Sequence, residues 1–285
     1  MKGKINMGMF KTLLFIAGLG IPLFSQGFIG DQLENGSVNY ADRTITAIGI
    51  GFIPENAINA GQARRSALRI AKQDALRNLV EIVNGIVVTS ETTVSGAMFD
   101  DEIKTQVKGV IRGAERTGDP KYLSDTSVEV KYQVKMSGIS EVLIPPAIIS
   151  AALENTGTEK KAVVNKTIDP SSGDITGIII DAQGLKVRPA LAPKVIDKDG
   201  GIVYGPGDYS REYAVTQGVV GYSKTIESAR EDQRVKGNPL VIKATGVSGK
   251  NSTDIIIGND DIKRVGSANT SYGVLKDCRI IILLD

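Results

Sequence analysis

The clearest pattern in the chain is a strict alternation of apolar and polar residues between positions 128 and 136. The apolar positions are Val128, Val130, Tyr132, Val134 and Met136, and the polar ones are Glu129, Lys131, Gln133 and Lys135. Successive side chains of a strand point to opposite faces, so this run predicts a strand with one buried and one exposed face. Such a strand is typical of an antiparallel sheet with helices on one side.

A long helix is predicted over residues 57–83, because small and apolar residues recur there at steps of three and four. These residues are Ala60, Ala63, Ala67, Ile70, Ala71, Ala75, Leu79 and Ile82. Alanines at the contact would let the helix axis approach a sheet closely. A strand over residues 40–50 precedes the helix and ends near Gly49 and Gly51, and Gly85 is expected to stop the helix.

Two further elements complete the first predicted domain. Residues 86–94 alternate in character and predict a strand. Three acidic residues at 100–102 favour the start of a second helix running through Ile111, because negative charge suits a helix N-terminus. We therefore expect a compact β-α-β-α-β domain over residues 38–137, followed by a linker over residues 138–165.

The second half, residues 166–285, contains six short apolar runs bounded by Gly, Pro or Asp, which predict strands. They cover residues 176–181, 193–197, 201–204, 240–245, 254–257 and 279–284. Helices are predicted near residues 224–233 and 259–268. The fold class expected from the sequence is α+β, with two domains that each pack helices on a mostly antiparallel sheet.

The first 27 residues have the layout of a secretory signal peptide. Lys2, Lys4 and Lys11 precede an apolar run over residues 12–24, and the small residues of Ser25-Gln26-Gly27 suit cleavage before Phe28. A retained membrane anchor is the alternative, but the run is short for a spanning helix and contains a proline. No cysteine lies at this site for lipid attachment. We expect an exported, periplasmic or envelope-secreted protein of a Gram-negative-type bacterium.

Charge and composition exclude several classes of function. Removal of residues 1–27 leaves 31 basic and 32 acidic residues, a net charge of −1, which gives no electrostatic footprint for nucleic acid. The chain has no histidine, so Ser-His and Cys-His nucleophile pairs and imidazole metal sites are impossible. The single cysteine, Cys278, is expected to be a buried apolar residue. We expect no enzymatic activity, no catalytic residue, no metal and no cofactor.

Three motifs with possible chemistry have simpler interpretations. Gly49-Ile50-Gly51 lies between a strand and a helix, but Pro54 stands where a dinucleotide loop needs its third glycine. Asp197, Asp199 and Gly200 resemble part of a calcium loop, although a hairpin turn explains them better. Asp181 and Asp197 could converge as a carboxylate pair at strand ends, and the alternative is that both are turn residues.

Two groups of residues are candidate binding surfaces. The first is the basic set on the long predicted helix, namely Arg64, Arg65, Arg69, Lys72 and Arg77, which is a candidate partner surface. The second is an aromatic patch of Tyr204, Tyr209, Tyr213 and Tyr222, which could contact a protein or a glycan. The alternative for the tyrosines is that some fill the second core and the others lie singly on the surface.

Residues 40–140 resemble the LPP20 lipoprotein family and the related N-terminal domain of flagellar assembly protein T. The resemblance rests on Ala63-Arg64-Arg65-Ser66-Ala67, Asp74-Ala75, the Gly85 turn, the segment 109–114 and the strand that ends at Met136. It implies an α+β module in the outer membrane or periplasm that takes part in flagellar or other envelope assemblies. The family's lipid-anchoring cysteine has no counterpart here, so any membrane contact is expected to be indirect, through partners.

The leading hypothesis is therefore a non-enzymatic structural protein that acts in cell-envelope assembly, at the flagellum or the outer membrane. Its partners would be envelope or flagellar proteins, or further copies of the chain, and neither nucleic acid nor lipid directly. Exposed sheet edges are candidate sites for such partners. The alternatives are a cell-wall glycan-binding protein that uses the second domain, and a carboxylate-based hydrolase, for which two acids would suffice.

Overall fold

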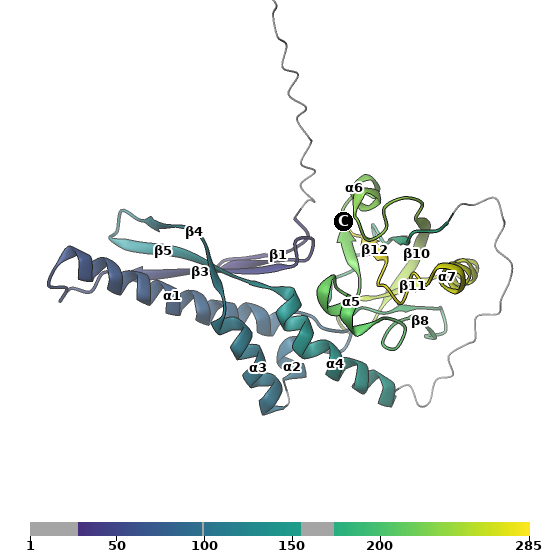
Figure 1. The fold of residues 1–285 in the computed structure, drawn as a ribbon, viewed down its shortest axis with the longest axis horizontal. Coiled ribbons are helices and arrows are strands. Elements are labelled where there is room, and N and C mark those ends of the chain that lie inside the picture. The colour runs from purple at the N-terminus through teal and green to yellow at the C-terminus, as the bar shows by residue number, and fades with distance from the viewer. Residues whose placement is uncertain (1–27, 99, 155–173) are drawn as a thin grey trace, which may run out of the picture.

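The computed structural model describes residues 28–98, 100–154 and 174–285. Two sheets lie beside each other along the long axis of the molecule, one in each half of the chain (Figure 1). The predicted signal peptide, residues 1–27, lies outside the described residues. The α+β class predicted from the sequence is confirmed, since helices pack on both sheets.

The first sheet has five strands and is antiparallel throughout. Its strands are β1 (Gly30–Leu33), β2 (Gly36–Asn39), β3 (Thr44–Phe52), β4 (Glu115–Tyr122) and β5 (Ser127–Lys135), in the spatial order β1-β2-β3-β5-β4. Val128, Val130 and Val134 are buried, whereas Lys131 and Lys135 are exposed, as the alternating pattern predicted. The central strands β3 and β5 pair over nine residues each and hold the sheet together.

Helix α1 (Ala60–Gly85) lies directly on β3, and glycine makes the close approach possible. A Cβ atom at Gly49 would overlap the backbone of Ala71 and Ala75, and one at Gly51 would overlap the backbone of Ala67. All three alanines are fully buried. The predicted close packing of an alanine-lined helix on a sheet is therefore confirmed. The Gly49-Ile50-Gly51 motif serves this packing, which accounts for both of its glycines.

The other helices of the first half pack on the same core. They are α2 (Val94–Ala97), α3 (Asp101–Arg112) and α4 (Met136–Glu154). The strand predicted over residues 86–94 is wrong, because this segment forms a turn with one isolated bridge between Val87 and Thr93 before α2 begins. The segment bonds instead to the second half, a contact that local alternation does not reveal.

The predicted linker over residues 138–165 is also wrong in its first part. Helix α4 follows β5 without a break and buries Met136, Ile139, Leu143 and Ile144 in the core. Residues 155–173, the remaining part of that prediction and the start of the predicted second domain, lie outside the described residues.

The second sheet has seven strands in the spatial order β8-β7-β11-β10-β6-β12-β9. The strands are β6 (Ile178–Asp181), β7 (Val195–Ile196), β8 (Ile202–Tyr204), β9 (Gly221–Ser223), β10 (Leu240–Ser248), β11 (Asp254–Ile257) and β12 (Ile280–Leu283). The helices are α5 (Arg211–Thr216), α6 (Ile226–Glu231) and α7 (Asn259–Tyr272). All six predicted strands and both predicted helices are present, whereas β9 and α5 were not predicted.

The strands of the second sheet are not mostly antiparallel, in contrast to the expectation from the sequence. Four of its six pairings are parallel, and only β10 with β11 and β7 with β8 run antiparallel. Helix α6 lies between β9 and β10 along the chain, and helix α7 lies between β11 and β12; neither pair is adjacent in the sheet, so both connections cross over other strands. The sheet is mixed, and strand β6, which lies between β10 and β12, is buried on both faces.

The two halves share one continuous hydrophobic core. The rings of Tyr40 and Tyr222 meet edge to face, with centroids 5.8 Å apart, and both belong to this core. The backbone N–H groups of Leu191 and Ala192 donate to the carbonyl oxygens of Val87 and Val88, at 3.0 and 2.8 Å. These two hydrogen bonds and the shared core join the halves into one packed body.

None of the described helices is long and apolar enough to cross a membrane.

Candidate functional site

The candidate site is the part of β3 that has no neighbouring strand on one side. Strand β2 pairs only with residues 44–47 of β3, whereas β5 pairs with all of residues 44–52. One edge of β3 is therefore open from Ile48 to Phe52. An open edge presents backbone N–H and C=O groups that can pair with another chain.

Side chains and a turn close the first part of this edge. The N–H of Ile48 donates to the carbonyl of Asn35 at 2.8 Å, and the side-chain amide of Asn78 donates to the carbonyl of Ile48 at 2.8 Å. The N–H of Ile50 donates to the carboxylate of Asp74 at 3.0 Å. Asp74 and Asn78 are one turn apart on α1, so the helix covers the edge with its own polar side chains.

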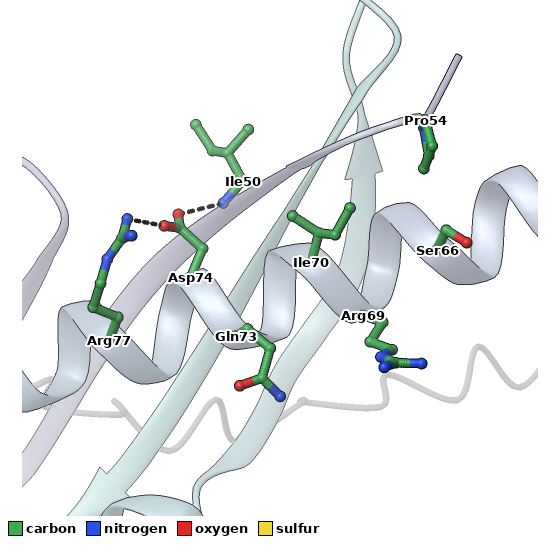
Figure 2. A pocket seen from close by; sticks show the side chains of 8 residues that line it. All are labelled: Ile50, Pro54, Ser66, Arg69, Ile70, Gln73, Asp74 and Arg77. Carbon is green, nitrogen blue, oxygen red and sulfur yellow. Dashed lines mark hydrogen bonds and ion pairs between the residues drawn. The ribbon is translucent and has the colours of Figure 1, made fainter. Parts of the chain in front are cut away.

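A groove of about 650 Å³ lies between this edge and the flank of α1 (Figure 2). Ile50 and Pro54 line it from the strand side, and Ser66, Arg69, Ile70, Gln73, Asp74 and Arg77 line it from the helix. Figure 2 shows Asp74 between Ile50 and Arg77, bonded to both. The groove is thus bounded by a strand edge and a helix flank, a geometry that suits an extended peptide.

Exposed apolar side chains gather around the groove, at the end of the sheet where β3 finishes beside the β4–β5 turn. Among the described residues, seven of the ten large apolar side chains that are exposed belong to this region: Ile50, Phe52, Ile53, Ile58, Ile70, Tyr122 and Leu123. The end of β3 lies beside the β4–β5 turn because Phe52 pairs with Ser127 and Tyr122 pairs with Val128. This end points away from the second half (Figure 1). A local concentration of exposed apolar surface marks an interaction site better than single exposed residues do.

The five basic residues predicted as one partner surface divide between two flanks of α1. Arg69 and Arg77 line the groove. Arg64 lies over the ring of Tyr122 on β4, 5.2 Å from its centroid, and Lys72 lies 5.7 Å from the ring centroid of Tyr132 on β5. Strands β4 and β5 are on the opposite side of β3 from its open edge. The structure therefore brings two of the five residues to the groove and sends two away from it.

Arg65 is exposed and does not line the groove. Ile50, Ile70 and Asp74 belong to the site but were not predicted from the sequence. The sequence did hold a signal for Asp74, because this residue adjoins the alanine face of the helix. A carboxylate in that position lies close to the element on which the face packs. Its role depends on β2 being shorter than β3, which the sequence pattern did not reveal.

The four tyrosines do not form an exposed aromatic patch. Tyr204, Tyr209 and Tyr222 are 1%, 7% and 5% exposed, whereas Tyr213 is 40% exposed. Burial raises the pKa of the three buried phenols well above the ordinary value of 10.0. Tyr204 donates to the carbonyl of Val219 at 2.7 Å, and Tyr222 bonds to the backbone of Ala190. The patch prediction is wrong, and the alternative, core tyrosines with one on the surface, is confirmed.

The acidic residues considered for chemistry occupy turns. Asp197 accepts hydrogen bonds from the N–H groups of Asp199 and Gly201 in the hairpin between β7 and β8, as the hairpin interpretation predicted. Asp181 accepts one from the N–H of Gln183. Within the described residues, no three acidic or cysteine side chains gather in a way that could hold a metal ion.

Cys278 is completely buried, as predicted, and burial raises the pKa of its thiol. The guanidinium of Arg234 lies close by and donates to the carbonyl oxygens of Gly218, Cys278 and Gln217. These bonds hold a loop of the second half in place, so the role of Arg234 is structural.

A comparison with family models adds one finding. Residues 177–285 match the second domain of Tp0624 from Treponema pallidum. This range starts one residue before β6 and extends to residue 285, so it coincides with the second sheet and its helices. No curated protein matches the chain.

Proposed function

We propose that this protein is a non-enzymatic assembly module of the bacterial cell envelope. It binds partner proteins through its distal end, the end of the first half where β3 finishes beside the β4–β5 turn. The observation that carries the proposal is the gathering of exposed apolar side chains around an open strand edge and a groove. The resemblance of residues 40–140 to the LPP20 family and to the N-terminal domain of flagellar assembly protein T favours an envelope or flagellar setting.

The second half supports this role as the packed body to which the first half is joined. Its singled-out acids bond within their own turns, and its buried tyrosines fill the core. The chain has no histidine, which removes most nucleophilic and imidazole acid–base mechanisms. We propose the periplasm of a Gram-negative-type bacterium as the location, on the basis of the signal-like start of the sequence.

Photo-crosslinking in living cells tests the proposal. The side chain of Ile58 is 87% exposed, so Ile58→p-benzoylphenylalanine places a crosslinker on the distal end without disturbing the core. We expect discrete protein adducts that mass spectrometry can identify and that an excess of unlabelled chain suppresses. The matched position Tyr213→p-benzoylphenylalanine, on the exposed surface of the second half, should give fewer of them.

The competing glycan-binding hypothesis gives a different result. If the purified protein binds isolated sacculi and Ile58→p-benzoylphenylalanine yields no protein adduct, the assembly role is overturned. Adducts of equal intensity from both positions would also contradict a distal binding site.

A further inference from the structure

The open edge of β3 keeps unpaired backbone groups beyond the Asp74 cap. The even-numbered residues of β3 direct these groups away from β5, as the bonds from Ile48 to Asn35 and from Ile50 to Asp74 show. The carbonyl of Ile50 and the N–H and carbonyl of Phe52 lie next along this edge. Among the described residues, no hydrogen bond to these three groups is present. They are the groups that a neighbouring strand would use.

A strand placed there would meet different surroundings on its two faces. Gly49 and Gly51 face α1, so the side chains of Ile50 and Phe52 lie on the opposite face, where they are 40% and 60% exposed. On the helix side, Arg69 and Ile70 line the groove. Because side chains alternate along a strand, one set would pack beside Ile50 and Phe52 and the other would face Arg69.

The positive charge of the groove favours acidic side chains in the set that faces Arg69. Helix α1 carries five basic residues and two acidic ones, Asp74 and Glu81. Asp74 is already paired with Arg77, whereas Arg69 makes no ion pair within the described chain. An incoming carboxylate would therefore find a free guanidinium at Arg69. Charge-assisted hydrogen bonds of this kind are among the stronger polar contacts.

A second copy of the chain fits this edge poorly. Symmetric pairing would bring two basic helices together and would place Pro54, which has no N–H, opposite Ile50. Strand β4, the outer strand at the opposite side of the sheet from β1, is interrupted by Pro120 and a register shift between Thr117 and Lys121. Such features blunt an edge against pairing.

We infer that the edge of β3 from Ile50 to Phe52 binds an extended segment of a partner protein by strand addition, with acidic side chains facing Arg69 and apolar ones beside Phe52. This inference rests on the proposed function and names the partner's chemistry. The segment forms backbone bonds with Ile50 and Phe52 and leaves the Asp74 cap in place.

Fluorescence anisotropy with a defined peptide tests the inference on the purified chain. The probe is a fluorescein-labelled seven-residue peptide of alternating Glu and Val, and the matched probe has Lys in place of Glu. We expect saturable binding of the Glu peptide and at least about tenfold weaker binding of the Lys peptide, because like charges then meet at Arg69. Failure of the Glu peptide to bind saturably overturns the inference.

Two pairs of variants locate the binding. Phe52→Pro removes an N–H that faces away from β5 and therefore leaves the β3–β5 ladder intact, whereas Phe52→Ala keeps that N–H. We expect about tenfold weaker binding for Phe52→Pro than for Phe52→Ala. Arg69→Glu should weaken binding about tenfold, and Arg65→Glu, the same charge change on the same helix outside the groove, should change it less than about threefold. Circular dichroism melting confirms that each variant folds.

Equal effects of Arg65→Glu and Arg69→Glu would show non-specific attraction and would overturn the inference. Unchanged binding by Phe52→Pro would do the same. If strand addition fails in these experiments but the crosslinks from Ile58 persist, the proposed function stands and only the mode of binding falls. If both the crosslinks and the peptide binding are absent, both proposals fall.

Discussion

The carboxylate of Asp74, on helix α1, accepts a hydrogen bond from the backbone N–H of Ile50 on β3, at 3.0 Å. The same carboxylate pairs with Arg77. A helix side chain thus takes the position that a neighbouring strand would occupy at this residue. Unpaired strand edges invite unwanted pairing, and natural sheets protect them with charges, bulges or covering elements. Here the cover ends at Ile50, which leaves Phe52 open for a partner.

Asp74→Ala should destabilise the fold by about 1 kcal/mol, because the N–H of Ile50 loses its protein partner at a site that water can reach. Asp74→Asn retains an oxygen that can accept this bond, so its loss should be smaller. Urea unfolding measures both free energies. If the two variants lose the same amount, the ion pair with Arg77 carries the stabilisation, and Arg77→Met should then reproduce it.

Gly51→Ala should destabilise the fold by about 3 kcal/mol or more, because the added methyl overlaps the carbonyl oxygen of Ala67 and the helix must move off the strand. Gly109→Ala is the matched change. Gly109 lies in the exposed interior of α3, and a methyl added there would have no atom within 4 Å, so alanine should stabilise by up to about 1 kcal/mol. Thermal melting of the two variants in parallel checks the opposite signs.

The elements that follow from local sequence pattern were largely predictable. Residues 128–136 and α1 show a clear period, and the apolar runs of the second half all became strands. The strands that were missed lack this signal. Strand β4, with the sequence ERTGDPKY, is polar because it forms the outer edge of the first sheet and none of its residues is buried.

Features that depend on contacts between distant segments could not be predicted. Residues 86–94 alternate like a strand, yet Val87 and Val88 accept hydrogen bonds from Leu191 and Ala192, about a hundred positions later in the chain. The parallel pairing of strands in the second sheet depends on the path of the connections between them, which the local sequence pattern does not encode. The candidate site also depends on contacts between distant segments, because Arg69 lines a groove beside the part of the β3 edge that β2 leaves open.

Gly249→Ala should loosen the junction between the halves. Gly249 has φ +83°, and a methyl there would overlap Cβ of Ser90 in the first half. Gly273→Ala is the matched control, since Gly273 has φ +63° but a methyl there would have no atom within 4 Å. Both variants bear the cost of a left-handed alanine, about 1 kcal/mol, and only Gly249→Ala adds the clash.

Hydrogen exchange at Leu191, Ala192 and Asn251, whose amides bond to the first half, separates the two effects. Protection should fall in Gly249→Ala and stay unchanged in Gly273→Ala. Ser90→Gly, introduced into Gly249→Ala, should restore protection in part by removing the clashing side chain. No change of protection in Gly249→Ala would show that the junction tolerates the methyl and does not depend on this contact.

Stability should be nearly constant between about pH 6 and pH 8 and should fall above about pH 9. The chain has no histidine, the side chain whose ordinary pKa lies in the first range. Burial raises the pKa of Tyr204, Tyr222 and Cys278 in the folded protein above their ordinary values of 10.0, 10.0 and 9.0. A group with a raised pKa stabilises the fold fully below its unfolded pKa and loses this contribution as the pH rises toward its folded pKa.

Cys278 should therefore lower the stability from about pH 9 and the buried tyrosines from about pH 10, each by about 1.4 kcal/mol per pH unit. Burial also lowers the pKa of Arg43 to about 10, which acts in the opposite direction only above that pH, because the folded state then releases its proton first. Urea unfolding across this range measures the slope. Cys278→Ala should remove the decline between about pH 9 and pH 10 and keep the steeper one above it. A decline that begins at the same pH in this variant would show that the thiol does not control the alkaline limit.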